Sequence, residues 1–239
     1  MDNRLKTIVD NLDKMKIGLD DTFKFNCTMC GKCCKDREDI LLTPRDVFHI
    51  AKQVDMLIGD FVKKYCDVYV GESSRIPIVR LLPTGIDKRC PFLRGTRCSV
   101  NSVKPTVCAL FPLGRCLTID SSKNRTEFTV GDIIYINQDP HCGDNRKTHT
   151  VREWLEASNI PVEDEFFVKW HSTIAQIGMT VHDAEKKADD ERMNRYFNLL
   201  FGLLYAAYDF KEDFLTQFNR NIEYALELTR RLKEEHNVG

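Results

Sequence analysis

Residues 27–34 read CTMCGKCC, and this stretch decides how the first half of the chain is organised. Four of its eight positions are cysteines, spaced C-x2-C-x2-C with a fourth cysteine directly after the third. Two intervening residues let a turn fold back, so that successive sulfurs face one ion or one cluster. Gly31 suits a turn that needs unusual backbone angles. The stretch therefore predicts a metal-binding loop rather than a helix or a strand.

The last two cysteines of the run, Cys33 and Cys34, are adjacent in the chain. Neighbouring side chains usually point apart, so we expect the two thiols to serve different centres. Two-cluster ferredoxins use a related arrangement, in which the fourth cysteine of a run binds the other cluster. The doubled cysteine therefore predicts one loop that is shared between two metal centres.

A second group of cysteines follows downstream. The segment RCPFLRGTRCSVNSVKPTVC contributes Cys90, Cys98 and Cys108, and Cys142 lies in DPHCGDN. Together with the first run they make eight thiols, which match two four-thiolate sites. The consecutive cysteines favour one or two [4Fe–4S] iron–sulfur clusters, and zinc is the alternative because it accepts four thiolates as readily. The predicted metal ligands, which are also the predicted cofactor-binding residues, are Cys27, Cys30, Cys33, Cys34, Cys90, Cys98, Cys108 and Cys142.

Other residues near these thiols have alternative interpretations. Cys66 lies in the apolar stretch FVKKYCDVYV and is expected in the core, and Cys116 has no partner at ligand spacing. His141 precedes Cys142 and is the one histidine that we consider as an alternative ligand. Basic side chains around the cysteines either offset thiolate charge or form a solvated surface. They are Lys32, Lys35, Arg37, Arg89, Arg94 and Arg97.

Composition narrows the class of protein. The chain has 239 residues, 10 cysteines and a formal net charge of −1, so no basic field favours nucleic acid or an anionic membrane. No secretory signal opens the chain and no window is long and apolar enough to span a bilayer, so we expect a cytoplasmic protein with reduced thiols. P-loop, G-x-S-x-G, H-E-x-x-H and G-x-G-x-x-G motifs are absent from the sequence, which assigns no catalytic residue.

Apolar spacing and helix breakers predict the first elements. A helix is expected over residues 1–22, and Thr43 and Pro44 begin another as N-cap and first helical residue. A further helix is expected over 57–70. The segment RIPIVRLLP predicts a strand, which Pro77 places at a sheet edge. One or two further strands are expected in TEFTVGDIIYINQD.

The composition changes after about residue 145, beyond which no cysteine occurs. A short helix in TVREWLEAS, a longer one after Pro161, and two more over 183–208 and 212–235 are predicted. The expected fold is α+β, mostly helical, with a small loop-rich cysteine core and a few short strands. We expect residues 1–145 to form a metal-binding domain with an N-terminal helix, and residues 146–239 to form a helical region packed on it.

At these motifs the chain resembles the CxxCxxCC cysteine-cluster family, also called YkgJ-like, whose members are described as zinc- or iron-chelating. Flagellin lysine N-methylases carry a similar cluster. The resemblance spans roughly residues 23–145, and its motifs are CTMCGKCC, ILLTPRDVFHIAK, CPFL, RCSV, KPTVCALFP and the Cys142–Gly143 pair. Lys104 and Ala109 depart from the family pattern, since an arginine is common at both positions. The change at Ala109 removes a cation that would pair with a thiolate or an anionic ligand.

Two functions follow from these observations. The resemblance implies a metal protein that has a redox role or supports a methyl-transfer-type modification of a protein. The alternative is a module without catalysis, in which zinc ions staple the loop-rich segment and the helical region binds a partner. In both cases the helical region is the expected surface for a protein substrate or partner, and binding of nucleic acid or membrane is not expected.

Overall fold

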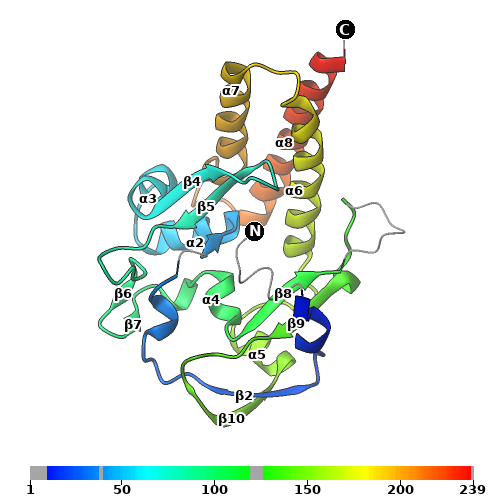
Figure 1. Cartoon of the computed structure of the whole chain (residues 1–239). Coiled ribbons are helices and arrows are strands. Elements are labelled where there is room, and N and C mark those ends of the chain that lie inside the picture. The colour runs from blue at the N-terminus through cyan, green and yellow to red at the C-terminus, as the bar shows by residue number, and fades with distance from the viewer. Residues whose placement is uncertain (1–9, 38–39, 119–125, 238–239) are drawn as a thin grey trace.

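The computed structural model of the chain describes residues 10–37, 40–118 and 126–237 (Figure 1). Its mixture of helices and short antiparallel sheets confirms the predicted α+β class and the helical C-terminal part. The helices are α2 (Pro44–Gln53), α3 (Ile58–Tyr65), α4 (Thr106–Leu110), α5 (Val151–Ala157), α6 (Glu165–Ala184), α7 (Asp190–Phe201) and α8 (Phe214–Asn237). Shorter helical turns are η1 (Lys32–Cys34), η2 (Asn101–Val103), η3 (Val130–Asp132) and the π-helical η4 (Gly202–Ala206).

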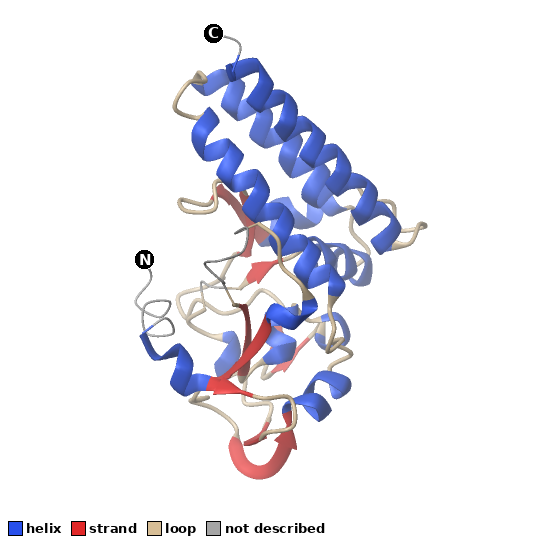
Figure 2. Ribbon diagram, turned by 90° about the vertical axis from the view of Figure 1, so that its right-hand side faces the viewer, coloured by secondary structure: helices blue, strands red, loops and turns tan. Residues whose placement is uncertain are grey.

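The strands are short, and they pair only in antiparallel fashion in the described residues. They are β1 (Lys16–Ile17), β2 (Thr22–Asn26), β3 (Leu41–Leu42), β4 (Cys66–Val70), β5 (Pro77–Leu81), β6 (Leu93–Arg94), β7 (Arg97–Cys98), β8 (Leu113–Leu117), β9 (Ile133–Asn137) and β10 (Asp144–Thr150). The sheet orders are β1-β9-β8, β3-β5-β4, β10-β2 and β6-β7. Figure 2 shows the long helices gathered at one end of the molecule and most of the strands towards the other.

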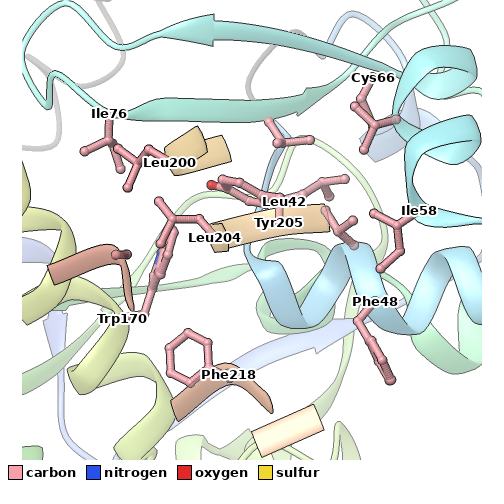
Figure 3. Close-up of a cluster of buried hydrophobic side chains, with 14 of the residues drawn as sticks. Leu42, Phe48, Ile58, Cys66, Ile76, Trp170, Leu200, Leu204, Tyr205 and Phe218 are labelled. Carbon is pink, nitrogen blue, oxygen red and sulfur yellow. The ribbon is translucent and has the colours of Figure 1, made fainter. Parts of the chain in front are cut away.

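The larger of two hydrophobic clusters joins the β3-β5-β4 sheet to α2, α3 and the three long helices (Figure 3). Leu200, Leu204 and Phe218 are almost completely buried there, beside Trp170 and Tyr205. A fully buried Leu or Phe side chain contributes about 1.5–3 kcal/mol relative to an exposed one. The helical end of the molecule is therefore held together by apolar packing.

Local signals explain where the main helices begin. Thr43 caps α2 as predicted: its hydroxyl accepts from the Asp46 N–H, and the Asp46 carboxylate accepts from the Thr43 N–H. Pro44 occupies the first helical position, where its missing N–H costs nothing. Asp164 and Asp189 cap α6 and α7 with their carboxylates.

The smaller hydrophobic cluster lies between β2, α4, β8 and α5. Phe23 and Phe25 pack edge-to-face against Trp154, with ring centroids 5.6 and 5.8 Å away. The Trp154 indole N–H donates to the Leu110 carbonyl at 3.0 Å, which ties α5 to α4. Both clusters draw on residues from each side of position 145. The division of the chain there stays a prediction.

Several predicted elements differ from the structure. The helix expected over 57–70 ends at Tyr65, because the aromatic and β-branched residues of Cys66–Val70 pair with β5 over five positions. RIPIVRLLP does contain a strand, β5, but it is the central strand of its sheet rather than an edge. Pro77 is tolerated because it is the first residue of that strand. TEFTVGDIIYINQD contains β9 as predicted.

The N-terminal helix is only partly testable. Residues 10–15 are helical, whereas residues 1–9 lie outside the described residues. The predicted helix ends at residue 15 rather than 22, because Lys16 and Ile17 form β1 and pair with β9. Within the described ranges, no helix combines the length and the apolarity needed to cross a membrane.

Candidate metal centre

The fold brings the cysteine-bearing segments together through two backbone contacts. Strand β10 pairs with β2, which places Asp144 opposite Asn26 and so sets Cys142 beside the start of the cysteine run. The Cys90 N–H donates to the Cys34 carbonyl at 2.8 Å. All ten cysteines of the chain are free thiols.

Left-handed backbone conformations concentrate in the loops that carry the thiols. Met29, Gly31 and Asp36 have φ values of 53°, 71° and 52° around the first run, and Gly143 has a φ of 75° directly after Cys142. Gly31 thus takes the conformation expected of it. A Cβ on Gly143 would lie 2.7 Å from the Asn26 carbonyl oxygen, so this close approach requires glycine.

Cys142 lies with the beginning of the run rather than with the other downstream cysteines. Burial raises the pKa of its thiol to about 11, and the charges of Cys33, Cys30 and Cys27 add to the effect. The Lys32 N–H bonds to the Cys30 sulfur and lowers its pKa, opposed by burial and assisted by the N–H that follows Cys142. We call Cys27, Cys30 and Cys142 the first set.

Cys34 lies with the remaining three thiols. Burial raises the pKa of Cys108, and the charge of Cys90 adds to it. Burial also raises the pKa of Cys90, where Cys98 adds a smaller effect. A hydrogen bond to Cys33 and burial raise the pKa of Cys34, and its proximity to Cys90 and Cys108 adds to the effect. We call Cys34, Cys90, Cys98 and Cys108 the second set.

Cys33 stands between the two sets. Its Sγ lies 3.9 Å from the Sγ of Cys34, whose thiol donates to it. This hydrogen bond lowers the pKa of Cys33 to about 6; burial opposes the shift, and Arg37 and Lys104 assist it. The same hydrogen bond raises the pKa of Cys34. The charge of Cys33 influences thiols of both sets, so the adjacent pair is where the sets meet.

The donor chemistry of these side chains fits zinc or iron, because both metals are bound by thiolates. In the parts of the chain that the structure describes, no three His, Cys, Asp or Glu side chains converge closely enough to hold a metal ion as they stand. Metal binding would therefore require the loops of each set to draw together. The identity of the eight ligands stays a prediction.

The cysteines and the histidine with alternative interpretations lie as follows. Cys66 is buried in the larger hydrophobic cluster, which confirms its predicted place in the core, and burial raises its pKa to about 12. Cys116 is half-buried in β8, where burial raises its pKa. His141 is exposed and lines a cavity together with Cys142.

Only part of the predicted basic surface acts on the thiols. Arg37 lowers the pKa of Cys33. Lys104, which is not among the predicted basic residues, has the same effect. Arg89 instead pairs with Asp87 at 2.8 Å. Arg94 donates to the Pro91 carbonyl at 2.7 Å and so braces the turn after Cys90.

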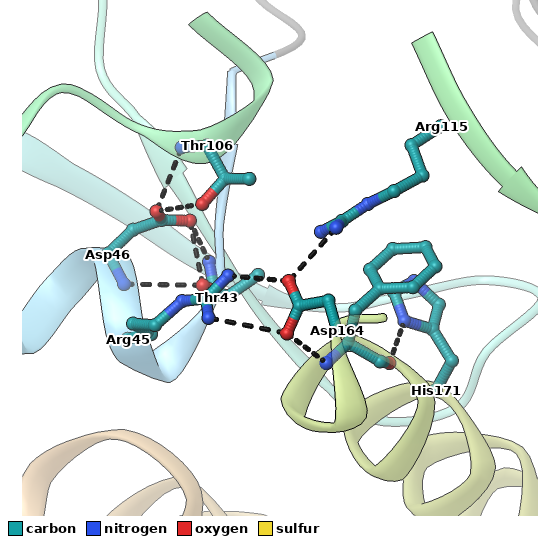
Figure 4. Close-up of polar contacts among 8 residues, drawn as sticks. Thr43, Arg45, Asp46, Thr106, Arg115, Asp164 and His171 are labelled. Carbon is teal, nitrogen blue, oxygen red and sulfur yellow. Dashed lines mark hydrogen bonds and ion pairs between the residues drawn. The ribbon is translucent and has the colours of Figure 1, made fainter. Parts of the chain in front are cut away.

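Sequence reasoning missed the second role of Asp46 (Figure 4). One oxygen of this buried carboxylate caps α2 through Thr43, and the other accepts from the N–H and the hydroxyl of Thr106, at 2.9 and 2.8 Å. Thr106 begins α4, the helix that carries Cys108. The capping pattern TPRD was visible in the sequence, but the partner 60 residues away was not.

A buried ion-pair network, also unpredicted, joins α2, β8 and α6 (Figure 4). The Asp164 carboxylate, 1% exposed, lies 2.9 Å from the guanidinium groups of both Arg45 and Arg115, and the Arg115 side chain is 3% exposed. The Arg115 guanidinium also lies over the Phe167 ring, 3.8 Å from its centroid. Burial favours the neutral form of Asp164, but the two arginines outweigh it and lower the pKa. The network fixes the cysteine-bearing part of the chain to the long helices.

Comparison with known proteins gives one match. Residues 26–143 match a family model described as "CxxCxxCC: Putative zinc- or iron-chelating domain". The matched segment is about half of the chain, and it contains both sets of thiols and Cys33. No curated protein and no solved structure matches the chain.

Proposed function

The chain belongs to the CxxCxxCC family through residues 26–143, and on this premise we propose that its eight clustered thiols chelate iron or zinc at two centres. The first centre would use the first set, Cys27, Cys30 and Cys142, together with Cys33. The second centre would use the second set. Each centre then has four thiolates, the number that closed zinc sites and [4Fe–4S] clusters require.

The grouping of the thiols carries this proposal. The β10–β2 pairing sets Cys142 beside the start of the cysteine run, although more than 100 residues separate it from Cys27 and Cys30, and the Cys90 N–H donates to the Cys34 carbonyl. Incidental cysteines at the surface or in the core have no reason to sort into two groups that meet at one adjacent pair. Cys66 and Cys116 show what such cysteines look like, since burial alone shifts their pKa values.

Of the two metals we favour iron, as one or two [4Fe–4S] clusters. Such clusters supply one-electron transfer when bound, which would give the protein a redox role. Arg37 and Lys104, which already stabilise the Cys33 thiolate, would offset the negative charge of a cluster. The resemblance to flagellin methylases extends the proposal to modification of a protein substrate. Ten free thiols suit a cytoplasmic site of action.

Metal analysis after anaerobic purification tests the proposal directly. Two [4Fe–4S] clusters predict about eight iron atoms and eight sulfides per chain with broad visible absorbance. Two zinc sites predict about two zinc ions and no visible absorbance. A chain that retains neither metal under anaerobic conditions, and takes up neither on reconstitution, would contradict chelation altogether.

Single substitutions then test the ligand assignment. Cys142→Ser should remove or alter one centre and leave the other loaded, because Cys142 belongs only to the first set. Cys116→Ser is the matched control: Cys116 is a half-buried thiol outside both sets, and its loss should leave the metal content unchanged. Equal metal content in all three proteins would exclude Cys142 as a ligand.

A second candidate, a zinc-stapled interaction module, is favoured by apolar side chains on the long helices. Met179, Leu199 and Tyr224 are 56%, 53% and 56% exposed on α6, α7 and α8. We propose this helical region as the surface for a protein partner or substrate. The module requires the cysteine region to lose its structure when zinc is removed. Retention of that structure without metal would exclude this candidate while leaving a redox role open.

A further inference from the structure

The two sets of thiols differ in how they are anchored. Cys27 and Cys30 of the first set are exposed, and Cys142 is half-buried. In the second set, Cys90, Cys98 and Cys108 are half-buried and pack against the larger hydrophobic cluster. Thiols packed on a core resist displacement, whereas thiols on a surface loop do not.

The two sets also differ in the hydrogen bonds that hold their backbone in place. In the second set, the Cys108 helix is held at its start by Asp46 through two hydrogen bonds to Thr106. The Cys90 N–H is fixed to the Cys34 carbonyl at 2.8 Å. The first set depends instead on the β2–β10 ribbon, whose register is interrupted between Asp144 and Thr148. A bulge of this kind leaves ladder groups unpaired and loosens the strand locally.

A cavity of about 300 Å³ opens beside the first set. Cys30 and Cys142 both line it, and most of the remaining lining residues are polar. Its other side chains include those of Thr28, Lys32, Asp139, His141 and Asn145. A second hollow, along residues 84–89, borders no cysteine of either set. An outside molecule of a few non-hydrogen atoms therefore has a built approach to Cys30 and Cys142.

From these observations we infer that the two centres are inequivalent: the first exchanges its metal with a small thiol that enters the cavity, and the second is structural. The inference rests on the proposed chelation by both sets. Such an exchange passes a metal ion from one group of thiolates to another, so it needs no oxidant or reductant.

Release kinetics from the zinc-loaded full chain test the inference. The chain is challenged with excess free L-cysteine, and released zinc is followed with a fluorescent zinc indicator. We expect two phases of about one equivalent each, with the second at least about tenfold slower. In Cys142→Ser the fast equivalent should be absent and the slow one retained. A single phase for both equivalents, or a slow phase that disappears in Cys142→Ser, would overturn the inference.

A cavity-filling variant tests the route. Asn145 is an exposed residue that lines the cavity, so Asn145→Trp should slow the fast phase several-fold and leave the slow phase unchanged. Lys147→Trp is the matched control: it places the same side chain at an exposed position of β10 outside the cavity lining. Equal rates in the two variants would exclude the cavity as the route. A chain that takes up neither zinc nor iron would instead refute the proposed function.

Discussion

The larger hydrophobic cluster and the cysteine loops differ in what holds each of them in place. In the cluster, Ile177, Leu200 and Leu204 have no exposed surface, so the removal of these side chains from water stabilises this part of the fold. In the first cysteine loop, residues 27–37, Cys27 and Cys30 are exposed, the backbone repeatedly takes left-handed turns, and the Met29 side chain is 55% exposed. A segment of this kind gains little from water exclusion, so its order depends on links to the rest of the chain and on a bound ligand.

Removing the metal should produce the largest difference between the two regions, measured as the rate of amide hydrogen exchange. We expect amide hydrogen exchange in residues 27–37, 90–108 and 138–145 to accelerate by about two orders of magnitude when the metal is chelated. Peptides from α6 and α8 should keep their protection, because apolar side chains such as Ile177 and Phe218 bury these helices and neither helix carries a thiol of either set. Equal loss in both regions would mean that the chain unfolds as a single unit around its metal.

Substitution of Asp164 should disrupt the buried ion-pair network that connects the cysteine-bearing part of the chain to the long helices. Asp164→Asn leaves the Arg115 guanidinium, 3% exposed, without its counter-charge. Removing one partner of a buried ion pair costs about 3–5 kcal/mol, and we expect this loss in the free energy of unfolding by urea.

A surface pair provides the control for Asp164. Glu191 lies 3.3 Å from Arg195 on α7, and both side chains are largely exposed. Glu191→Gln should therefore leave the urea midpoint unchanged. If Asp164→Asn were equally mild, the two regions would be joined by packing and not by the buried ion pair.

The sequence predicts contacts between residues that are close in the chain better than contacts between distant ones. The start of α2 was predictable, because Thr43 and Asp46 form a capping box within one helical turn. The central place of β5 and the position of Cys142 were not, because each depends on pairing with a distant strand. Phe23 of β2 also packs on Trp154 of α5, a contact that no local pattern contains. Spacing therefore identified the thiols but did not sort them into sets.

Gly143 tests whether the first set depends on that ribbon. An Ala at this position would bring a Cβ within 2.6 Å of the Phe25 ring and would adopt a φ of 75°. We expect Gly143→Ala to lower the free energy of unfolding by about 1–3 kcal/mol and to weaken binding of the first metal equivalent. Gly95 has a φ of 60° with no atom within 4 Å of an added Cβ. Gly95→Ala should thus be milder, and equal effects would assign the cost to backbone strain alone.

The pH dependence of the free energy of unfolding shows whether Asp164 stabilises the fold through its ion pairs with the two arginines. Its pKa in the folded chain is lowered, so the ionised carboxylate stabilises the fold at neutral pH. This contribution is complete above the unfolded-state pKa of about 3.9 and is lost as the pH falls through the lower folded-state pKa. The difference in unfolding free energy between the native chain and Asp164→Asn, both metal-free and reduced, should therefore stay constant above about pH 5 and shrink below about pH 4. Exposed carboxylates titrate in both proteins and cancel in the difference. A difference near zero at every pH down to pH 3 would mean that Asp164 acts through its helix cap, which asparagine also provides, and not through the arginines.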